Sequence, residues 1–283
     1  MLTTDLDVDQ LVQWLQLKNT PETIRTRVYW IQRLIRWASE SGTTVWELNA
    51  RDVNQWLLDC GLAPNTRRSA LSSARALYRW GLMTHQVSAD PTAQIPTIKV
   101  PRAAPRPAPS EAIERGLQRA TSRRDVLMIL LANYGGLRCA EIASLHSHDF
   151  HDRVLWITGK GGHTRIVPAH SLLAELLDLF PRGYYFPSEK NATGHYRPAS
   201  ISRRIRTLMD PGWSAHTLRH RFATDFYAHT PDLLALKDLL GHASVATTQI
   251  YTATDPRRLE AGVFALPELR GARAATSALA GVE

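Results

Sequence analysis

The chain has 283 residues, 44% of them hydrophobic and 21% charged, with a net charge of +8 and a pI near 9.8. This length suffices for two domains with separate cores, and the composition is that of an ordinary globular protein. No apolar run reaches membrane-spanning length and the acidic N-terminus lacks signal-peptide character, so we expect a soluble, cytoplasmic protein rather than a membrane-spanning or secreted one. Arginine outnumbers lysine, which favours nucleic acid as the partner, although a merely basic surface would give the same net charge.

Residues 1–87 predict a helical N-terminal unit, because apolar residues recur there at intervals of three and four. The helices are expected at residues 7–17, 21–42, 45–61 and 65–83, where 45–61 is either one helix or two short ones. The apolar faces of the second and fourth helices are expected to comprise Ile24, Val28, Ile31, Ile35 and Ala38, and Leu71, Ala74 and Tyr78. The tryptophans of this unit are expected in its core rather than as platforms for base stacking.

Several arginines of the second and fourth helices lie away from these apolar faces and could follow a DNA backbone. The six candidate DNA contacts are Arg25, Arg33, Arg36, Arg68, Arg75 and Arg79. A solvated helix face would show the same pattern, so the sequence leaves both interpretations open.

Residues 88–109 predict a linker between two domains. Prolines are dense in this stretch, which excludes a regular helix and favours an extended connector. The predicted organisation is therefore a helical domain at 1–87, a linker at 88–109, a larger domain at 110–254 and a tail at 255–283.

The larger domain predicts a mixed α+β structure. Its strongest strand signal lies at residues 153–169, where two β-rich runs flank a Gly-rich turn and indicate a hairpin. A short edge strand is expected at 184–188. Helices are expected at residues 111–120, 125–135, 139–145, 171–180, 198–210, 216–230 and 232–242. The predicted fold class is mainly α with a small antiparallel β hairpin or sheet.

The segment LLGHASVATTQIYTATD places His242 and Tyr251 nine residues apart around a Ser/Thr-rich turn. A tyrosine is a weak nucleophile at neutral pH, because its pKa is about 10. To attack phosphorus it needs fixed cations that stabilise the growing charge and an acid that protonates the leaving oxygen.

Other segments of the same domain offer these groups. GGLRCAEIASL places Arg138 at a helix start, with Glu141 three residues later on the same face, where it could orient the guanidinium. HTLRHRFAT places His216 and Arg219 on one helix face, and Lys160 lies at the tip of the predicted hairpin. Taken singly, each of these residues is more commonly a surface or structural residue.

Together, GLRCAEIASL, GKGGHTRIVP, HTLRHRFAT and LLGHASVATTQIYT closely resemble, in this order and at these separations, the motifs of the tyrosine recombinases. That family contains phage integrases and Xer-type and Cre-type enzymes. The resemblance covers nearly all of residues 110–251 and implies a mixed α+β catalytic domain. Residues 1–87 resemble the family's helical core-binding domain in size, helix content and basic faces.

The resemblance implies that Arg138 and Arg219 hold the non-bridging oxygens of a scissile DNA phosphate. Tyr251 would attack this phosphate and leave a 3′-phosphotyrosyl link and a free 5′-hydroxyl, with Lys160 as the acid for the leaving oxygen. The bond energy is kept in the covalent link, so rejoining to another strand needs no ATP.

The remaining residues have supporting roles in this resemblance. His216 would assist proton transfer at the tyrosine, and His242 would donate a hydrogen bond to the phosphate. Glu141 would orient the Arg138 guanidinium without contacting the phosphate itself. The cationic cluster takes the place of a metal, so no metal and no other cofactor is implied. The HSHDFHD segment at 146–152 could suggest a metal site, but it lacks distant ligands and is interpreted as a polar loop.

The resemblance also implies partners. With one active tyrosine per subunit, exchange between two duplexes needs a homotetramer on DNA and a Holliday-junction intermediate, so double-stranded recombination sites and the nucleoid are the expected setting. The tail at 255–283 is expected to dock on a neighbouring subunit, with a self-packing helix as the alternative. We expect no added small N-terminal domain of the kind found in many phage integrases, which favours a simpler system and leaves accessory directionality or DNA-bending proteins open.

Two alternatives stay open at this level. A type IB topoisomerase-like relaxase would share the phosphotyrosyl chemistry but act as a monomer, and only a recombinase would exchange strands between two marked duplexes. A DNA-binding accessory protein would keep the fold without cleavage, and would form no covalent adduct. The DNA site and the choice among integration, excision and resolution are not set by the sequence.

Overall fold

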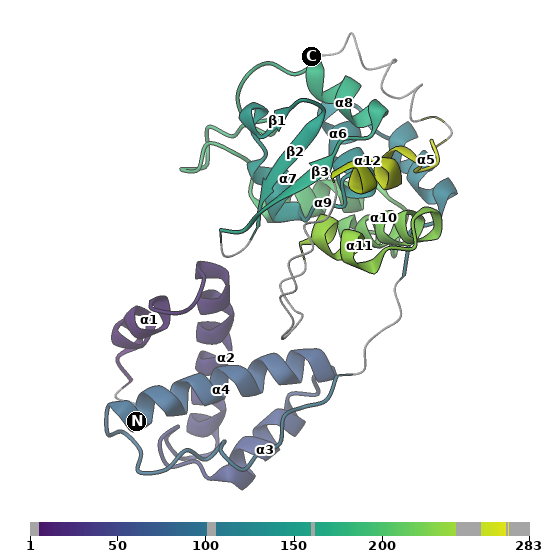
Figure 1. The fold of residues 1–283 in the computed structure, drawn as a ribbon. Coiled ribbons are helices and arrows are strands. Elements are labelled where there is room, and N and C mark those ends of the chain that lie inside the picture. Colours follow the sequence, from purple (N-terminus) through teal and green to yellow (C-terminus); the bar gives the residue numbers. More distant parts are fainter. Residues whose placement is uncertain (1–5, 101–105, 160–161, 242–255, 270, 272–283) are drawn as a thin grey trace. The chain divides into compact units, whose positions relative to one another are not determined.

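The computed structural model describes residues 6–100, 106–159, 162–241, 256–269 and 271. The chain divides into two compact units, Met1–Ala103 and Ala104–Glu283 (Figure 1). Both units are largely helical and the second carries one small antiparallel sheet, which confirms the predicted fold class. None of the helices in the described ranges combines the length and apolarity that a membrane crossing requires.

The described part of the first unit is built from four helices, two that begin at a side-chain cap and two that begin at a proline. The helices are α1 (Val8–Gln16), α2 (Pro21–Glu40), α3 (Ala50–Asp59) and α4 (Pro64–Met83). Proline opens α2 and α4, where its missing N–H costs nothing. Helix α3 begins only after Asn49, whose side chain forms a capping box with Asp52. Residues 45–61, predicted as one helix or two short ones, therefore contain one α-helix that is shorter than the segment, since this cap fixes its start.

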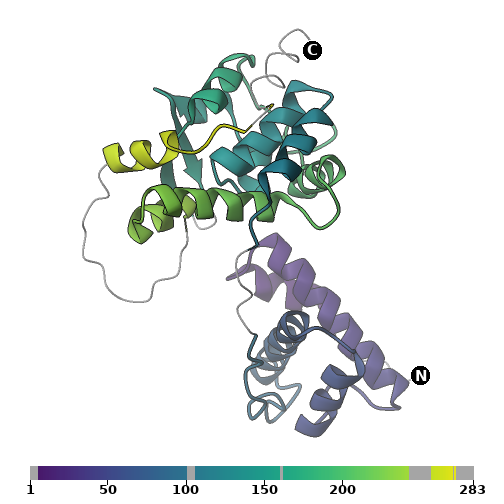
Figure 2. The ribbon, with the colours of Figure 1, turned by 90° about the vertical axis from the view of Figure 1, so that its right-hand side faces the viewer.

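The core of the first unit lies between α2 and α4, which pack against each other (Figure 2). Tyr78 of α4 is fully buried and its hydroxyl donates to the carbonyl of Val45 over 2.8 Å. All the tryptophans of this unit are in the core or pack against it, as predicted: Trp14, Trp30, Trp37, Trp46, Trp56 and Trp80.

The buried face of α2 differs in part from the predicted one. Ile24, Ile31 and Ala38 are buried as predicted. Trp30 and Leu34 are buried as well, whereas the predicted Val28 and Ile35 are only partly buried against the core. The buried face of α2 therefore extends to the side of the helix that carries Trp30 and Leu34.

Eight helices and a short 3₁₀ helix surround the second core within its described residues. They are α5 (Ser110–Gln118), α6 (Arg123–Tyr134), α7 (Cys139–Ser144), η1 (Ser147–Asp149), α8 (Ser171–Asp178), α9 (Pro198–Leu208), α10 (Ala215–His229), α11 (Leu233–Leu240) and α12 (Pro256–Phe264). Helix α6 is the central one, since its residues from Asp125 to Tyr134 are all buried and it packs against α8, α9 and α10.

The sheet has the antiparallel order β1 (Phe150–His151), β2 (Val154–Thr158), β3 (Thr164–Pro168). The β2–β3 pair is the predicted hairpin, with Leu155 opposite Val167 and Ile157 opposite Arg165. The edge strand predicted at 184–188 was wrong: only isolated bridges occur there, because Pro187 has no N–H to extend a ladder.

The ends of the stretch 88–109 pack on the units they join. Ile95 is buried in the first core and Ala108 in the second, where its N–H donates to the carbonyl of Thr217 over 3.1 Å. Both ends of the expected linker are therefore anchored, and the domain limits given from the sequence stay a prediction.

The tail packs on its own unit wherever the structure describes it. Val263 and Leu266 are buried in the second core, and Gly262 brings α12 against the ring of Phe226. Tyr134 anchors the segment after α12, because its hydroxyl donates to the carbonyl of Pro267 and accepts from the N–H of Leu269. This is the self-packing arrangement; docking of the tail on a neighbouring subunit stays a prediction.

The close approach at Gly262 makes a test of this packing. An added Cβ would lie 2.6 Å from Cζ of Phe226, too close for either group to stay in place. We therefore expect Gly262→Ala to lower the unfolding free energy of the full chain's second unit by about 1–3 kcal/mol. Since alanine is favoured by about 1 kcal/mol at an ordinary helical position, urea unfolding that shows a gain in stability would contradict the packing of α12.

Candidate active site

Arg138 and Glu141 are joined by the start of α7. Arg138 is the N-cap residue, and Oε2 of Glu141 accepts its backbone N–H over 2.7 Å. Oε1 of the same carboxylate accepts from Nη1 of Arg138 over 2.8 Å. The predicted i,i+3 relation is therefore realised as a capping interaction that also orients the guanidinium.

A second arginine, Arg165 of β3, binds the same carboxylate more fully. Its Nη1 and Nη2 donate to Oε1 and Oε2 of Glu141, each over 2.8 Å, in a bidentate pair. Arg219 of α10 lies at a longer distance, with Nη1 3.9 Å from Oε2. One buried carboxylate thus faces three guanidinium groups from α7, β3 and α10.

The same three arginines hold the end of α11. Arg165 donates through Nε to the carbonyl of Leu239 over 2.7 Å, Arg219 donates through Nη2 to Leu240, and Arg138 donates through Nη2 to Gly241 over 3.1 Å. The last carbonyls of a helix lack partners within the helix and carry its negative dipole end. Gly241 makes this arrangement feasible, because it ends the helix in the left-handed region at φ 59°.

Arg219 is the most buried of the three, with 8% of its side chain exposed. Its Nη1 also donates to the carbonyl of Gly136, the second glycine of the pair before Arg138. Burial and repulsion from Arg138 lower the pKa of Arg219 to about 10. The guanidinium remains charged at neutral pH, but its charge is poorly compensated by the protein around it.

Glu141 remains ionised in spite of its burial. Burial raises its pKa, but hydrogen bonds and charge from Arg165, together with those from Arg138, outweigh this effect and hold the pKa below the ordinary carboxyl value. A buried carboxylate is stable only with such partners. The cluster therefore has one negative and three positive groups.

The described structure brings together Arg138, Arg219 and Glu141 of the predicted site. His216 lies on α10 with Arg219, is exposed, and meets the ring of His220 with centroids 4.2 Å apart. Burial, His216 and Arg219 lower the pKa of His220.

Three predicted catalytic residues, Lys160, His242 and Tyr251, lie outside the described residues. Their roles stay predictions. The described cluster borders two of them in sequence, since His242 follows Gly241 directly and Lys160 precedes Arg165 by five residues.

Arg165 was missed by sequence reasoning, although the strand pattern contains a signal for it. Side chains alternate along a strand, so Arg165 shares the core side of β3 with the buried Val167. A charged residue on the apolar side of a strand must have a partner.

The HSHDFHD segment forms polar and aromatic contacts of a loop. Nδ1 of His146 accepts the N–H of His148, their ring centroids lie 4.0 Å apart, and His151 stacks on Trp156. Among the described residues no group of three or more His, Cys, Asp or Glu side chains is arranged to hold a metal ion.

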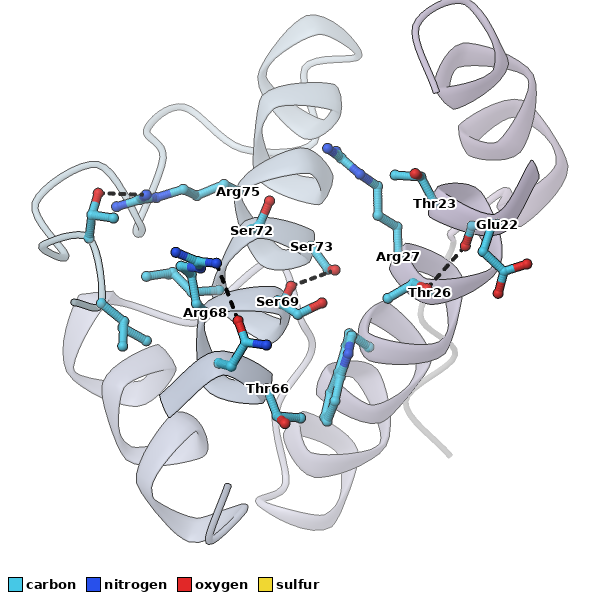
Figure 3. Close-up of a pocket in the computed structure, with 15 residues that line it drawn as sticks. Glu22, Thr23, Thr26, Arg27, Thr66, Arg68, Ser69, Ser72, Ser73 and Arg75 are labelled. Carbon is cyan, nitrogen blue, oxygen red and sulfur yellow. Dashed lines mark hydrogen bonds between the residues drawn. The ribbon is translucent and has the colours of Figure 1, made fainter. Parts of the chain in front are cut away.

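The first unit has a separate groove of about 800 Å³ between α2 and α4, lined by apolar side chains, by the carboxylate of Glu22 and by cationic and hydroxyl groups. Arg27 reaches it from α2, and Arg68 and Arg75 from α4 (Figure 3). Hydroxyl groups line the space between these arginines: Thr23, Thr26, Thr66, Ser69, Ser72 and Ser73. Cations and hydroxyls are the groups that bind phosphate oxygens in DNA complexes.

The six arginines predicted as DNA contacts do not share one surface. Arg68 and Arg75 line this groove, but Arg33 and Arg36 line a different pocket beside α3. Arg25 is exposed and pairs with Glu22.

Other contacts limit what some of these arginines can do. Arg75 is partly occupied by the carbonyl of Ile95 and the hydroxyl of Thr97. Arg33 donates to the hydroxyl of Tyr29 over 3.3 Å. Burial and electrostatic repulsion from Arg79 lower the pKa of Arg27, so Arg79 affects the groove residue Arg27 through its charge.

Arg27 is the groove residue that sequence reasoning missed. It precedes the buried Trp30 and Leu34 by three and seven residues, so it lies on the side of α2 that faces α4. Arg27 was missed because the predicted apolar face of α2 did not include Trp30 and Leu34.

Comparisons with known proteins agree with the geometry. The profile of the phage integrase family matches residues 110–258. The chain is 33% identical over 227 residues to the tyrosine recombinase XerD of Pseudomonas putida, covering 72% of this chain and 76% of that protein. It is 29% identical over 248 residues to the tyrosine recombinase XerC of Xanthomonas campestris, covering 80% and 76%.

Solved structures give the same result for the fold. The integrase from mycobacterium phage Brujita is 28% identical with a TM-score of 0.54, and 92% of each chain is covered. A lambda integrase dimer bound to a COC′ core site has a TM-score of 0.64 at 17% identity, covering 84% of this chain and 73% of that one. The chain therefore belongs to the phage integrase family, the tyrosine-type site-specific recombinases whose motifs its sequence resembles.

Proposed function

We propose that this tyrosine recombinase cleaves and rejoins double-stranded DNA through a 3′-phosphotyrosyl intermediate formed by Tyr251. We further propose that strand exchange proceeds through a Holliday junction in a homotetramer. The observation that carries the proposal is the cluster of Arg138, Arg165 and Arg219 around the single carboxylate of Glu141.

The charges of this cluster call for an anion. Glu141 compensates one guanidinium, and the carbonyls at the end of α11 satisfy hydrogen bonds without adding negative charge. A phosphodiester supplies one negative charge and two non-bridging oxygens. Arg138 is suited to bind it, because 41% of its side chain is exposed and two of its contacts leave further donors among its five N–H groups.

In the proposed reaction, the Tyr251 oxygen forms a bond to phosphorus while the bond from phosphorus to the 5′-oxygen breaks. The leaving oxygen takes its proton from Lys160, and the phenol proton passes toward His216. Arg138 and Arg219 stabilise the charge that grows on the non-bridging oxygens. Attack by the 5′-hydroxyl of another strand reverses these steps and releases the tyrosine.

His242 has a supporting role in this proposal, as a hydrogen-bond donor to the phosphate. It comes directly after the helix end that Arg138 and Arg219 hold. The cluster that would bind the phosphate therefore also fixes the backbone at which the nucleophile segment begins.

The groove between α2 and α4 is the proposed DNA contact of the first unit. Its arginines and hydroxyls suit backbone phosphates, and its place between two helices suits contact with a groove edge. Lambda integrase, which has a similar fold, is known as a dimer bound to a core site and as a tetramer bound to a Holliday junction. These assemblies support the proposed partners, double-stranded sites and further copies of the chain.

The first prediction concerns the covalent link. Full-length protein is incubated with sheared genomic DNA that contains its own gene, then denatured, and covalently bound DNA is recovered. We expect recovery of DNA joined through its 3′ end at a defined sequence, because the phosphotyrosyl bond survives denaturation. Tyr251→Phe should recover none.

The matched control is Tyr227→Phe, which removes an exposed hydroxyl outside the predicted motifs. It should leave adduct formation unchanged. An adduct that persists in Tyr251→Phe, or is absent from the wild type, would overturn the assigned nucleophile. Two marked duplexes carrying the recovered site then separate recombination from simple relaxation, since only recombination exchanges the markers.

The second prediction concerns the charge of Glu141. Replacing it by Gln removes the counter-charge from three guanidinium groups, so we expect Glu141→Gln to lower the unfolding free energy by about 2–4 kcal/mol at pH 7. Because the folded pKa of Glu141 is depressed, its contribution is complete above the unfolded pKa of about 4.3 and is lost as pH falls through the folded pKa.

The measurement is urea unfolding of both proteins between pH 7 and pH 3. The difference between wild type and Glu141→Gln should shrink toward the acid end of this range. Glu175→Gln, which changes an exposed carboxylate on α8, should have little effect at any pH. A difference for Glu141→Gln that stays constant with pH would contradict the assigned ionisation.

The third prediction concerns the groove of the first unit. Each phosphate contact contributes about 0.9 to the slope of log affinity against log salt concentration. We expect Arg27→Gln and Arg68→Gln each to weaken binding to the recovered site and to reduce that slope by about one. Arg51→Gln, an equal charge change at an exposed position of α3, should reduce the slope by much less. Equal effects at all three positions would indicate a general charge effect instead of a contact.

A further inference from the structure

Arg165 is the most fully engaged arginine of the cluster. Both terminal nitrogens bind Glu141, and Nε binds the carbonyl of Leu239 over 2.7 Å. Only 10% of its side chain is exposed, against 41% for Arg138. Burial does not set Arg165 apart from Arg219, which is 8% exposed; the difference is that all three nitrogens of the Arg165 guanidinium, including Nε, bind the protein.

The aliphatic part of the Arg165 side chain contacts Gly241 at the C-terminal end of α11. A Cβ on Gly241 would lie 3.0 Å from Cδ and 3.1 Å from Nη1 of Arg165, so the two residues are in close contact. The carbonyl of Gly241 in turn accepts from Arg138. Arg165 thus touches both partners of Arg138, the carboxylate on one side and the helix end on the other.

We propose that Arg165 is a positioning residue for DNA cleavage, which sets the direction of the Arg138 guanidinium by holding Glu141 and the end of α11 in a fixed relation. This inference rests on the proposed function. Positioning of this kind matters because small displacements of a catalytic group cost a large part of its effect.

The chemistry of arginine explains why this position carries it. A planar fork can bind both carboxylate oxygens while Nε, in the same plane, binds a third acceptor. Lysine would keep the positive charge but offers a single ammonium group, which cannot reach Glu141 and Leu239 with the same geometry. Arg165→Lys therefore separates charge from positioning.

The experiment measures covalent adduct formation by the full chain on a nicked duplex of the recovered DNA site. We expect Arg165→Lys to form the adduct about 10- to 100-fold more slowly, with non-covalent affinity for the same duplex within about twofold of wild type. Arg115→Lys is the matched control, because it changes a surface arginine that pairs with Asp210 outside the cluster. It should behave as wild type.

Two further readouts separate positioning from a general loss of structure. If Arg165 acts through Glu141, the double variant Arg165→Lys/Glu141→Gln should form the adduct no more slowly than Glu141→Gln alone. If the two residues act independently, the factors by which the two substitutions slow adduct formation should multiply. The ratio of the Arg165→Lys rate to the wild-type rate should also fall as pH falls from about 7 to 5. In the variant, buried Glu141 loses the partner that keeps it ionised and can then take up a proton.

The outcomes are distinct. A wild-type protein that forms no adduct defeats the proposed function, whereas an active wild type with an equally fast Arg165→Lys overturns the role of Arg165. Multiplied rates in the double variant would also overturn it. If Arg165→Lys does not fold, Arg165→Gln serves instead, because it removes the guanidinium contacts to both Glu141 and Leu239 and keeps a polar side chain. Its adduct rate must fall by about tenfold or more for the proposal to stand, and a wild-type rate would reject it.

Discussion

The carboxylate of Glu141 holds together parts of the second unit that are far apart in sequence. It caps the start of α7, receives the fork of Arg165 from β3, and lies 3.9 Å from Arg219 of α10. Without it, three guanidinium groups would face one another in a half-buried space, where their repulsion is weakly screened. The arrangement of the predicted phosphate site therefore depends on this one buried negative charge.

The end of α11 completes the same arrangement. Three consecutive carbonyls, from Leu239 to Gly241, accept from the three arginines. These contacts stabilise the cations with the negative end of a helix dipole while leaving their net charge in place. A phosphate bound there would meet groups that are already ordered, which is the condition under which electrostatic stabilisation is most effective.

Local relations in this site could be predicted from the sequence, and long-range ones could not. Arg138 and Glu141 are three residues apart on a short helix, so their contact follows from helix geometry. The contact between Arg165 and Glu141 joins a strand to a helix 24 residues away in sequence, and only the tertiary packing of the second unit determines it. The pattern of β3 did contain the warning, a charged side chain on the buried side.

The first unit shows a different limit. The positions of the long helices and the burial of the tryptophans followed from periodicity, but the buried face of α2 includes Trp30 and Leu34 beside the predicted residues. One helix residue corresponds to a rotation of about 100°. Because of this small error in the predicted face, Arg25, Arg33 and Arg36 were predicted as DNA contacts of α2, and Arg27 was not. Sequence periodicity locates a helix more reliably than it orients the charged residues along its edges.

The central claim is that Arg138 and Arg219, held by Glu141 and Arg165, form the binding site for the scissile phosphate. The most direct measurement is a crystal structure of the covalent complex with the recovered DNA site. The account predicts non-bridging oxygens of the phosphotyrosine within about 3 Å of both guanidinium groups, with Glu141 still bound to Arg165. A phosphate held elsewhere, with both arginines still bound only to the protein, would contradict it.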